Sequence, residues 1–325
     1  MEEIKILQTA SYLPAKVVAN DDLTQLMDTS DEWISQRTGI KRRHISLKQN
    51  TADLATQVAR RLLAEEGVSP EQIGLIIVAT MSPDSYTPAT AARVQGMVGA
   101  TNAIAFDLSA ACSGFVYGLA VAHDLMRTNS HCRYAMVIGA EVLSKLVDWH
   151  DRRSAVIFGD GAGGVLLGRS SVNQPVWLGQ NLRTFGDRGD EITAGILPAG
   201  ESFPPARPRL STFMMDGRGV YKFATHQVPT SVRLAANQAG ISLDQIDCFV
   251  LHQANARIVK QVARRLGQPM TKFPLNISEV GNTAAASEPL LLDHLVQTGK
   301  IRRGNILALS GFGGGLTTGT IILRY

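Results

Sequence analysis

The sequence predicts an α/β protein built from two similar halves, with largely parallel sheets covered by helices. Short apolar runs alternate with stretches of helical periodicity along the chain. Residues 67–79 also align without a gap on residues 240–252, and each copy passes from a helix through a glycine stop and a turn into an apolar strand. A second pair, residues 155–168 and 307–323, resembles a strand, a glycine turn and a returning strand.

Two matches at so long a separation indicate duplication of a domain rather than a solenoid of short repeats. We therefore predict an N-terminal half over residues 1–174 and a C-terminal half over residues 175–325.

In the first half, the clearest helix is expected over residues 51–66, where apolar residues recur at helical spacing and Gly67 follows as a stop. A short strand is expected at residues 4–7, and helix-like segments from Asp21 and over residues 31–40. Apolar runs at residues 75–79 and 103–108 predict buried strands, and a buried helix should begin at Gly114.

In the second half, residues 181–213 contain four prolines and are expected to form an irregular excursion. An apolar run over residues 248–251 predicts a strand that leads through His252 into a helix, and residues 273–277 are strand-like.

Composition excludes several classes of protein. The chain is 45% hydrophobic and 18% charged, with a net charge of +4; this charge is compatible with acidic partners but far weaker than a nucleic-acid footprint. No basic region leads into a long apolar run and no apolar stretch reaches the length of a membrane span, so we expect a cytoplasmic protein without a membrane partner. Three scattered cysteines are too few for a disulfide framework or a zinc site, and no metal is expected.

Cys112 is the candidate nucleophile, because it stands where a predicted strand ends and a predicted helix begins. Small residues on both sides leave room for a substrate, and the helix N-terminus is expected to stabilise the thiolate and lower the pKa of the thiol. A small buried hydrophobic residue is the alternative interpretation.

Three further features point to chemistry at strand ends. His252 follows a predicted strand at its carboxyl end, where open α/β sheets place ligands. Asn282 follows a glycine, and the glycine run at residues 311–315 could bring backbone N–H groups close to an oxyanion. The alternatives are a structural histidine, a turn asparagine and a tight hairpin. Together with Cys112, these residues suggest acyl transfer through a thioester.

At these residues the chain resembles the thiolase superfamily, and specifically the β-ketoacyl-acyl-carrier-protein synthase III family. The motifs are WISQRTGI at residues 33–40, ACSGF at 111–115, FGDGAG at 158–163, HQAN at 252–255, GNT at 281–283 and FGGG at 312–315. The resemblance covers essentially the whole chain. It implies a homodimer of five-layered αβαβα subunits, with two mixed sheets and a buried central helix pair, and an activity that starts fatty acid biosynthesis.

The resemblance also implies roles for the site residues. Cys112 would attack an acyl-CoA and carry the acyl group, with its own N–H and that of Gly314 as the oxyanion hole. His252, as a neutral imidazole, and Asn282 would donate hydrogen bonds to the thioester oxygen of malonyl-acyl carrier protein while it loses carbon dioxide. Phe312 would pack beside the malonyl carboxylate.

Partner contacts are implied in the same way, and no cofactor is expected. Trp33 and Arg152 would sandwich the adenine of CoA, and Arg37 would hold its phosphates; the alternatives are a half-buried anchor and a surface charge. Five basic residues are candidates for docking the acidic acyl carrier protein, although each could be simply solvated: Lys222, Arg257, Lys260, Arg264 and Arg265.

Two positions depart from the family pattern. Thr87 stands where many relatives carry a phenylalanine that closes the acyl pocket across the dimer interface, so we expect tolerance of primers beyond acetyl, including branched ones. Glu288 replaces a residue that is usually apolar. A hydroxymethylglutaryl-CoA synthase is disfavoured because Ala79 occupies the position of its glutamate; a starter enzyme of a secondary-metabolite pathway or a non-catalytic acyl-binding protein remains an alternative.

Overall fold

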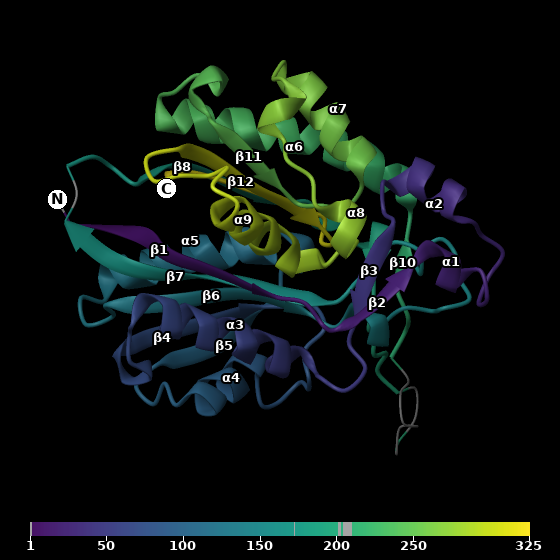
Figure 1. The fold of residues 1–325 in the computed structure, drawn as a ribbon, viewed down its shortest axis with the longest axis horizontal. Helices are drawn as coiled ribbons and strands as arrows, with labels where there is room; N and C mark the ends of the chain where they lie inside the picture. Colours follow the sequence, from purple (N-terminus) through teal and green to yellow (C-terminus); the bar gives the residue numbers. More distant parts are fainter. Residues whose placement is uncertain (1, 172, 201–202, 204–209) are drawn as a thin grey trace.

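The computed structural model describes residues 2–171, 173–200, 203 and 210–325, which form five layers in the order helix, sheet, helix, sheet, helix (Figure 1). The predicted αβαβα architecture is therefore confirmed. The boundary predicted between residues 174 and 175 lies between two strands that belong to different sheets, β7 (Gly161–Ser171) and β8 (Trp177–Thr184).

Each half contributes one main sheet, and both sheets are mixed. The first has the order β1 (Glu2–Tyr12), β7, β6 (Tyr134–Glu141), β4 (Ile73–Ala79) and β5 (Ile104–Leu108). The second has the order β11 (Cys248–Leu251), β12 (Ile306–Gly313), β13 (Thr317–Arg324) and β8. Among the strands of these two sheets, as far as the structure describes them, β4 pairs parallel with β5 and β6, and β11 pairs parallel with β12. The expectation of largely parallel sheets is wrong, because β1, β7 and β6 pair antiparallel in the first sheet, as do β12, β13 and β8 in the second. β6 to β7 and β12 to β13 are connected without an α-helix, which permits antiparallel pairing.

Six helices make the three helical layers. The outer pairs are α3 (Thr51–Glu66) with α4 (Thr90–Val98), and α6 (Gly217–Ala239) with α7 (Ala256–Leu266); the central pair is α5 (Gly114–Thr128) with α9 (Ser287–Gln297). Apolar residues of α5 and α9, such as Phe115 and Leu291, pack in one cluster with Ile77 of the first sheet and Leu309 of the second. The central helices are therefore buried between the two sheets.

The aligned repeat has the same local structure in both copies. Gly67 and Gly240 adopt left-handed φ angles of 69° and 66° and end α3 and α6. A serine three residues before a glutamine then caps a short 3-10 turn, η1 (Pro70–Gln72) or η5 (Leu243–Gln245), that leads into β4 or β11. This part of the duplication is confirmed.

The prediction that both segments of the second aligned pair form hairpins is confirmed for only one of them. Residues 307–323 form the expected hairpin of β12 and β13. Residues 155–168 do not, because the chain turns before Phe158 and this residue makes a single bridge to Asn282, so that only β7 is a strand.

Two other expectations need correction. Residues 273–277 are not a strand: they lead from η6 (Met270–Lys272) into α8 (Ile277–Val280), and Pro274 has no N–H for a ladder. The start of the 181–213 excursion belongs to β8, and β9 (Ile192–Thr193) pairs with β10 (Met214–Met215) across it; residues 201–202 and 204–209 lie outside the described residues.

The remaining elements are β2 (Lys16–Ala19), α1 (Asn20–Leu23), α2 (Asp31–Thr38), β3 (Arg42–Ile45), η2 (Ala111–Ser113), η3 (Leu143–Lys145), η4 (Gly186–Glu191) and η7 (Ala284–Ala286).

Candidate active site

Cys112 lies at a strained turn between β5 and α5. It belongs to η2, which runs directly into α5, and its residue is only 8% exposed. The preceding Ala111 has a φ of 45°, a left-handed conformation that costs free energy for a residue with a β-carbon. Ser113 is tied across to the second half by a 2.9 Å contact between its Oγ and the Oγ1 of Thr317. The turn thus holds the sulfur in one place.

Glycines of β12 pack directly against this turn. A β-carbon at Gly313 would lie 2.8 Å from both the N and the Cβ of Cys112 and 3.1 Å from its Sγ. A β-carbon at Gly311 would lie 2.8 Å from the Cα of Ser113. Gly314 lies beside Ala111, with its β-carbon position 3.3 Å from the Ala111 Cβ. Only bare backbone fits at Gly311 and Gly313, so these two glycines serve close approach as well as the hairpin.

The thiol does not have the lowered pKa expected from its helix terminus. Burial raises the pKa of Cys112 well above its ordinary value, and the carboxyl groups of Glu288 and Glu141 add to this effect only when they are ionised. The expectation of a stabilised thiolate is wrong for the free protein, because desolvation of the sulfur outweighs the helix N-terminus. Cys112 is therefore a neutral thiol before substrate binds.

Glu141 is a buried acid that sequence reasoning missed. It ends β6, is 0% exposed, and accepts hydrogen bonds from the Ser82 Oγ at 2.5 Å, the Thr80 Oγ1 at 3.1 Å and the backbone N of Met81 at 3.1 Å. Burial raises its pKa to about 7, against the effect of these donors. The sequence does contain a signal for Glu141, because this acid stands at the end of an apolar strand, as His252 does.

His252 lies just beyond β11 and is 1% exposed. Its backbone N donates to the Ser310 carbonyl oxygen at 2.9 Å, and its ring meets the Phe312 ring edge-on, with centroids 5.0 Å apart. Burial lowers the pKa of the imidazole to about 3. His252 is therefore neutral near pH 7 and can donate from only one ring nitrogen.

Asn282 is held by residues 157–159 of the first half, at the start of the FGDGAG segment. Its backbone N donates to the Ile157 carbonyl oxygen and its own carbonyl oxygen accepts from the Gly159 N, both at 2.9 Å. Its Oδ1 accepts from the Ala284 N at 2.9 Å. The side-chain oxygen is thus occupied, which leaves the amide NH₂ as the group able to donate to a ligand.

These segments meet around the nucleophile. Cys112, Phe158 and Ala284 belong to one buried apolar cluster, which brings the Asn282 loop to the sulfur. Gly313 contacts Cys112 while its neighbour Phe312 contacts His252, which brings β12 and the histidine to the same place. The structure therefore brings Cys112, His252, Asn282 and the glycine strand together from four distant parts of the chain.

The residues expected to bind CoA also cluster. The guanidinium carbons of Arg37 and Arg152 lie 4.7 Å and 5.3 Å from the centroid of the Trp33 ring. The Arg37 carbonyl oxygen accepts from the Asn255 side-chain amide at 3.0 Å, which ties α2 to the HQAN segment. Arg152 packs directly on Trp33, so an adenine could enter between them only if the arginine swings away.

The basic residues expected on one helix face are exposed there. Arg257, Lys260 and Arg264 are all exposed on α7, just beyond His252, and Arg265 is half-buried. Lys222 is exposed on α6. Thr87, in contrast, lies on an exposed loop beside Tyr86, which is 74% exposed, so the described residues of one chain close no pocket over it.

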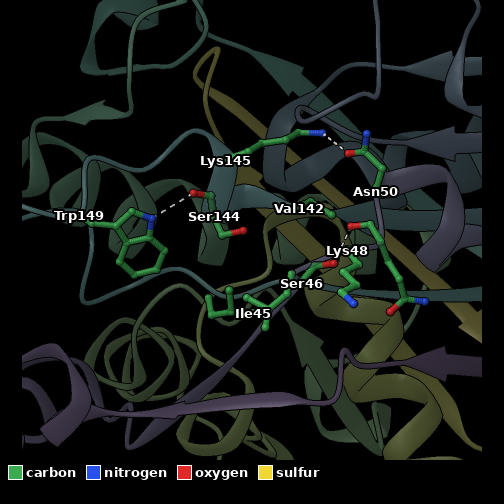
Figure 2. A pocket seen from close by; sticks show the side chains of 10 residues that line it. Ile45, Ser46, Lys48, Asn50, Val142, Ser144, Lys145 and Trp149 are labelled. Atoms are coloured by element: carbon green, nitrogen blue, oxygen red, sulfur yellow. Dashed lines mark hydrogen bonds between the residues drawn. The ribbon is translucent and has the colours of Figure 1, made fainter.

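A separate hollow of about 500 Å³ opens between residues 45–50 and residues 142–149 (Figure 2). The Lys145 Nζ donates to the Asn50 Oδ1 at 3.0 Å, and the Trp149 Nε1 donates to the Ser144 carbonyl oxygen at 3.2 Å. These polar groups are already paired, and the hollow contains none of the predicted site residues.

Comparison with known proteins gives consistent results. Residues 106–186 match the family model described as 3-oxoacyl-[acyl-carrier-protein (ACP)] synthase III, and residues 236–325 match the model for the C-terminal part of the same family. The chain is 57% identical to a β-ketoacyl-[acyl-carrier-protein] synthase III of Limosilactobacillus reuteri, with 100% of each chain aligned. It is 53% identical to that of Lactobacillus helveticus, over 100% of this chain and 99% of the relative.

Solved structures agree with the sequence matches. The 3-oxoacyl-[acyl-carrier-protein] synthase III of Aquifex aeolicus superposes with a TM-score of 0.91 at 38% identity, covering 99% of this chain and all of the other. A priming β-ketosynthase from the R1128 polyketide biosynthetic pathway reaches the same TM-score at 32% identity, covering 99% of this chain and 96% of the other. Within the described part of the chain, none of the helices combines the length and the apolarity that crossing a membrane requires.

Proposed function

The chain belongs to the β-ketoacyl-acyl-carrier-protein synthase III family, the condensing acyltransferases of the thiolase superfamily that start fatty acid biosynthesis, and on this premise we propose how its own residues perform the reaction. An acyl-CoA primer acylates Cys112, and malonyl-acyl carrier protein then condenses with the acyl group to give 3-ketoacyl-acyl carrier protein, CoA and carbon dioxide. The convergence of Cys112, His252 and Asn282 beside the glycine strand carries this proposal.

In the first step the Cys112 sulfur attacks the thioester carbonyl carbon of the primer. The backbone N–H groups of Cys112 and Gly314 stabilise the oxyanion, and both belong to segments that touch in the structure. CoA leaves as a thiolate and takes up the proton that the cysteine loses. Because the free thiol is neutral, this proton transfer has to accompany the attack rather than precede it.

In the second step the malonyl group loses carbon dioxide and forms an enolate. His252 donates from one ring nitrogen and Asn282 donates from its amide to the thioester oxygen, where negative charge develops. The apolar ring of Phe312 excludes water from the carboxylate that is lost. The enolate carbon attacks acyl-Cys112, and the thiolate that leaves is protonated from solvent to restore the thiol.

CoA and the carrier protein bind around the entrance. Trp33 stacks the adenine with Arg152 on its other side, and Arg37 binds phosphate; their clustering on α2 and the 145–153 segment supports this. The exposed cations of α7 with Lys222 form a positive surface next to His252. An acidic carrier protein would be steered to this surface by opposite charge.

The active unit is a homodimer in the cytoplasm. β5 is an edge strand of its sheet, and its first residue, Ile104, is 60% exposed. An exposed apolar edge is a template for pairing with another chain, here a second copy. The partner would cover the Tyr86–Thr87 loop. Thr87 is smaller than phenylalanine, so the pocket completed there admits branched and longer primers.

Intact-protein mass spectrometry tests the function. Purified protein is mixed separately with acetyl-CoA, isobutyryl-CoA and octanoyl-CoA, and malonyl-acyl carrier protein is added afterwards. We expect an acyl adduct that is absent in Cys112→Ser and is discharged into a 3-ketoacyl product. If no primer labels the wild-type protein, or if the adduct survives the addition of malonyl-acyl carrier protein, the proposed condensation is wrong; an adduct from acetyl-CoA alone would contradict the wider pocket.

A further inference from the structure

Glu288 is a buried acid that the proposed reaction does not use. It lies in the first turn of the central helix α9 and is 0% exposed. Among the described residues, neither of its carboxyl oxygens has a hydrogen-bond partner. A buried acid without a partner costs free energy, so its presence at the start of a central helix calls for a role.

The carboxyl of Glu288 lies against Gly311, the residue next to His252 on the neighbouring strand. The backbone N of His252 donates to the Ser310 carbonyl oxygen at 2.9 Å, and in a parallel ladder this bond makes Gly311 the neighbour of His252 in the sheet. The Glu288 Oε1 lies 2.7 Å from the β-carbon position of Gly311, so the carboxyl occupies the space that a side chain at residue 311 would fill. On the other side, the Ser287 Oγ accepts from the Gln253 N at 2.7 Å, which anchors the start of α9 to the residue after the histidine.

His252 has a matching unpaired atom. Its Nδ1 is buried and has no hydrogen-bond partner among the residues that the structure describes. In a neutral imidazole one nitrogen donates and the other accepts. The Nε2 atom can donate only if Nδ1 carries no hydrogen, and a donor facing Nδ1 would favour that tautomer.

Glu288 is suited to be that donor because it should be uncharged. Glu141, the other buried acid near Cys112, accepts several hydrogen bonds, as an ionised carboxylate requires. Glu288 has none, and an unpaired carboxylate in a dry interior costs several kcal/mol. Burial accordingly raises the pKa of Glu288 well above its ordinary value. The neutral acid has one O–H group to donate.

We propose that Glu288 is a positioning residue for His252: its carboxylic acid hydrogen-bonds the Nδ1 atom and fixes the tautomer in which Nε2 carries the hydrogen. No hydrogen bond joins the two groups among the described residues, so the proposal requires a rotation of the Glu288 side chain or one bridging water to complete the link. The consequence for catalysis rests on the proposed function, in which Nε2 donates to the malonyl thioester. The tautomer of His252 can be measured whether or not that function is correct.

The first test is nuclear magnetic resonance on the wild-type protein labelled with ¹⁵N-histidine. The chain has seven histidines, and the signal of His252 is the one lost in His252→Asn. We expect a neutral ring with the hydrogen on Nε2 at pH 7. A hydrogen on Nδ1, or on both nitrogens, overturns the proposal without any variant of Glu288.

Two variants with a control separate positioning from packing. Glu288→Gln keeps the shape and can donate from its amide, so it should keep the tautomer and condense malonyl-acyl carrier protein within about threefold of wild type. Glu288→Val removes the donor, so it should mix the tautomers and slow decarboxylation about tenfold or more, while acylation of Cys112 stays within about twofold. Asp293→Asn is the control, because Asp293 is also buried on α9 but pairs with Thr9 and Ser11; it should leave the His252 signal unchanged.

If Glu288→Val has the wild-type tautomer and the wild-type decarboxylation rate, the proposal is wrong. If the wild-type protein has the expected tautomer but never condenses malonyl-acyl carrier protein, the proposed function fails and the contact stands. The two failures are therefore distinguishable.

Discussion

Replacing Gly313 by alanine should displace the nucleophile and slow its acylation. The new β-carbon would lie 2.8 Å from both the N and the Cβ of Cys112, whereas non-bonded carbon atoms settle at about 3.5–4.0 Å. Relief of this overlap requires a relative shift of roughly 0.7–1 Å between β12 and the turn that carries the sulfur. A misplacement of about 1 Å at a reacting centre costs about 10²-fold in rate.

The assay is the rate at which one equivalent of acyl-CoA labels Cys112, followed by mass. Gly313→Ala should label about 10²-fold more slowly than wild type and lose about 1–3 kcal/mol of unfolding free energy, as overpacked cores do. The matched control is Gly314→Ala, whose β-carbon would lie no closer than 3.3 Å to Ala111 and which keeps the backbone N–H. It should label within a few-fold of wild type. Labelling of Gly313→Ala at the wild-type rate would refute the close approach as the determinant of sulfur position.

Three other outcomes are expected. Asn282→Ala should still be acylated by acyl-CoA but decarboxylate malonyl-acyl carrier protein about 10²–10³-fold more slowly, since it loses one donor to the enolate; equal loss in both half-reactions would contradict this. Arg257→Glu with Arg264→Glu should raise KM for carrier protein about tenfold or more at low salt and leave acylation by acyl-CoA unchanged; an unchanged salt dependence of KM would contradict the docking surface. Burial lowers the pKa of His252 in the folded protein to about 3, from the ordinary 6.5, so the unfolded chain binds the proton first as pH falls. Between pH 6.5 and pH 4, wild type should therefore lose about 3 kcal/mol more unfolding free energy than His252→Asn. If urea denaturation gives both proteins the same dependence of stability on pH, the burial of a neutral ring is contradicted.

Local pattern predicted the elements that depend on local interactions. Both ends of the helix at residues 51–66 were predicted correctly, because the signals that define it lie within it or directly beside it. These are a capping box at Asn50 and Asp53, apolar residues at helical spacing and a left-handed glycine directly after its end. Phe158 shows the opposite case. Its apolar neighbours read as a strand, but its partner is Asn282, more than a hundred residues away, and no local rule contains that contact.

The same distinction explains the error at Cys112. A helix N-terminus is visible in the sequence, and it does stabilise a thiolate. The main opposing effect is the burial of the sulfur, which depends on how the second half packs against the Cys112 turn. The sequence around the turn was enough to identify Cys112 as the nucleophile, whereas the charge state of its thiol depends on the folded structure.

The duplication itself explains why the site needs both halves. In the aligned segments Gly159 of the first half matches Gly311 of the second. A β-carbon at Gly159 would collide with the Val280 carbonyl oxygen, in the loop that carries Asn282, and one at Gly311 would lie 2.8 Å from the Cα of Ser113, beside the nucleophile.

Each half therefore uses its glycine to receive the functional loop of the other half. Glycine is required at both places for the same reason, since a side chain would push the received loop away. Neither half alone contains a nucleophile together with the donors that act on its acyl group, because Cys112 comes from the first half and His252 and Asn282 come from the second. The exchange of loops at the matched glycines is what joins them into one site. Gly159→Ala should therefore slow decarboxylation through the Asn282 loop. Gly311→Ala should slow both half-reactions, acylation through the Cys112 turn and decarboxylation through Glu288, because its β-carbon would lie 2.8 Å from the Ser113 Cα and 2.7 Å from the Glu288 Oε1.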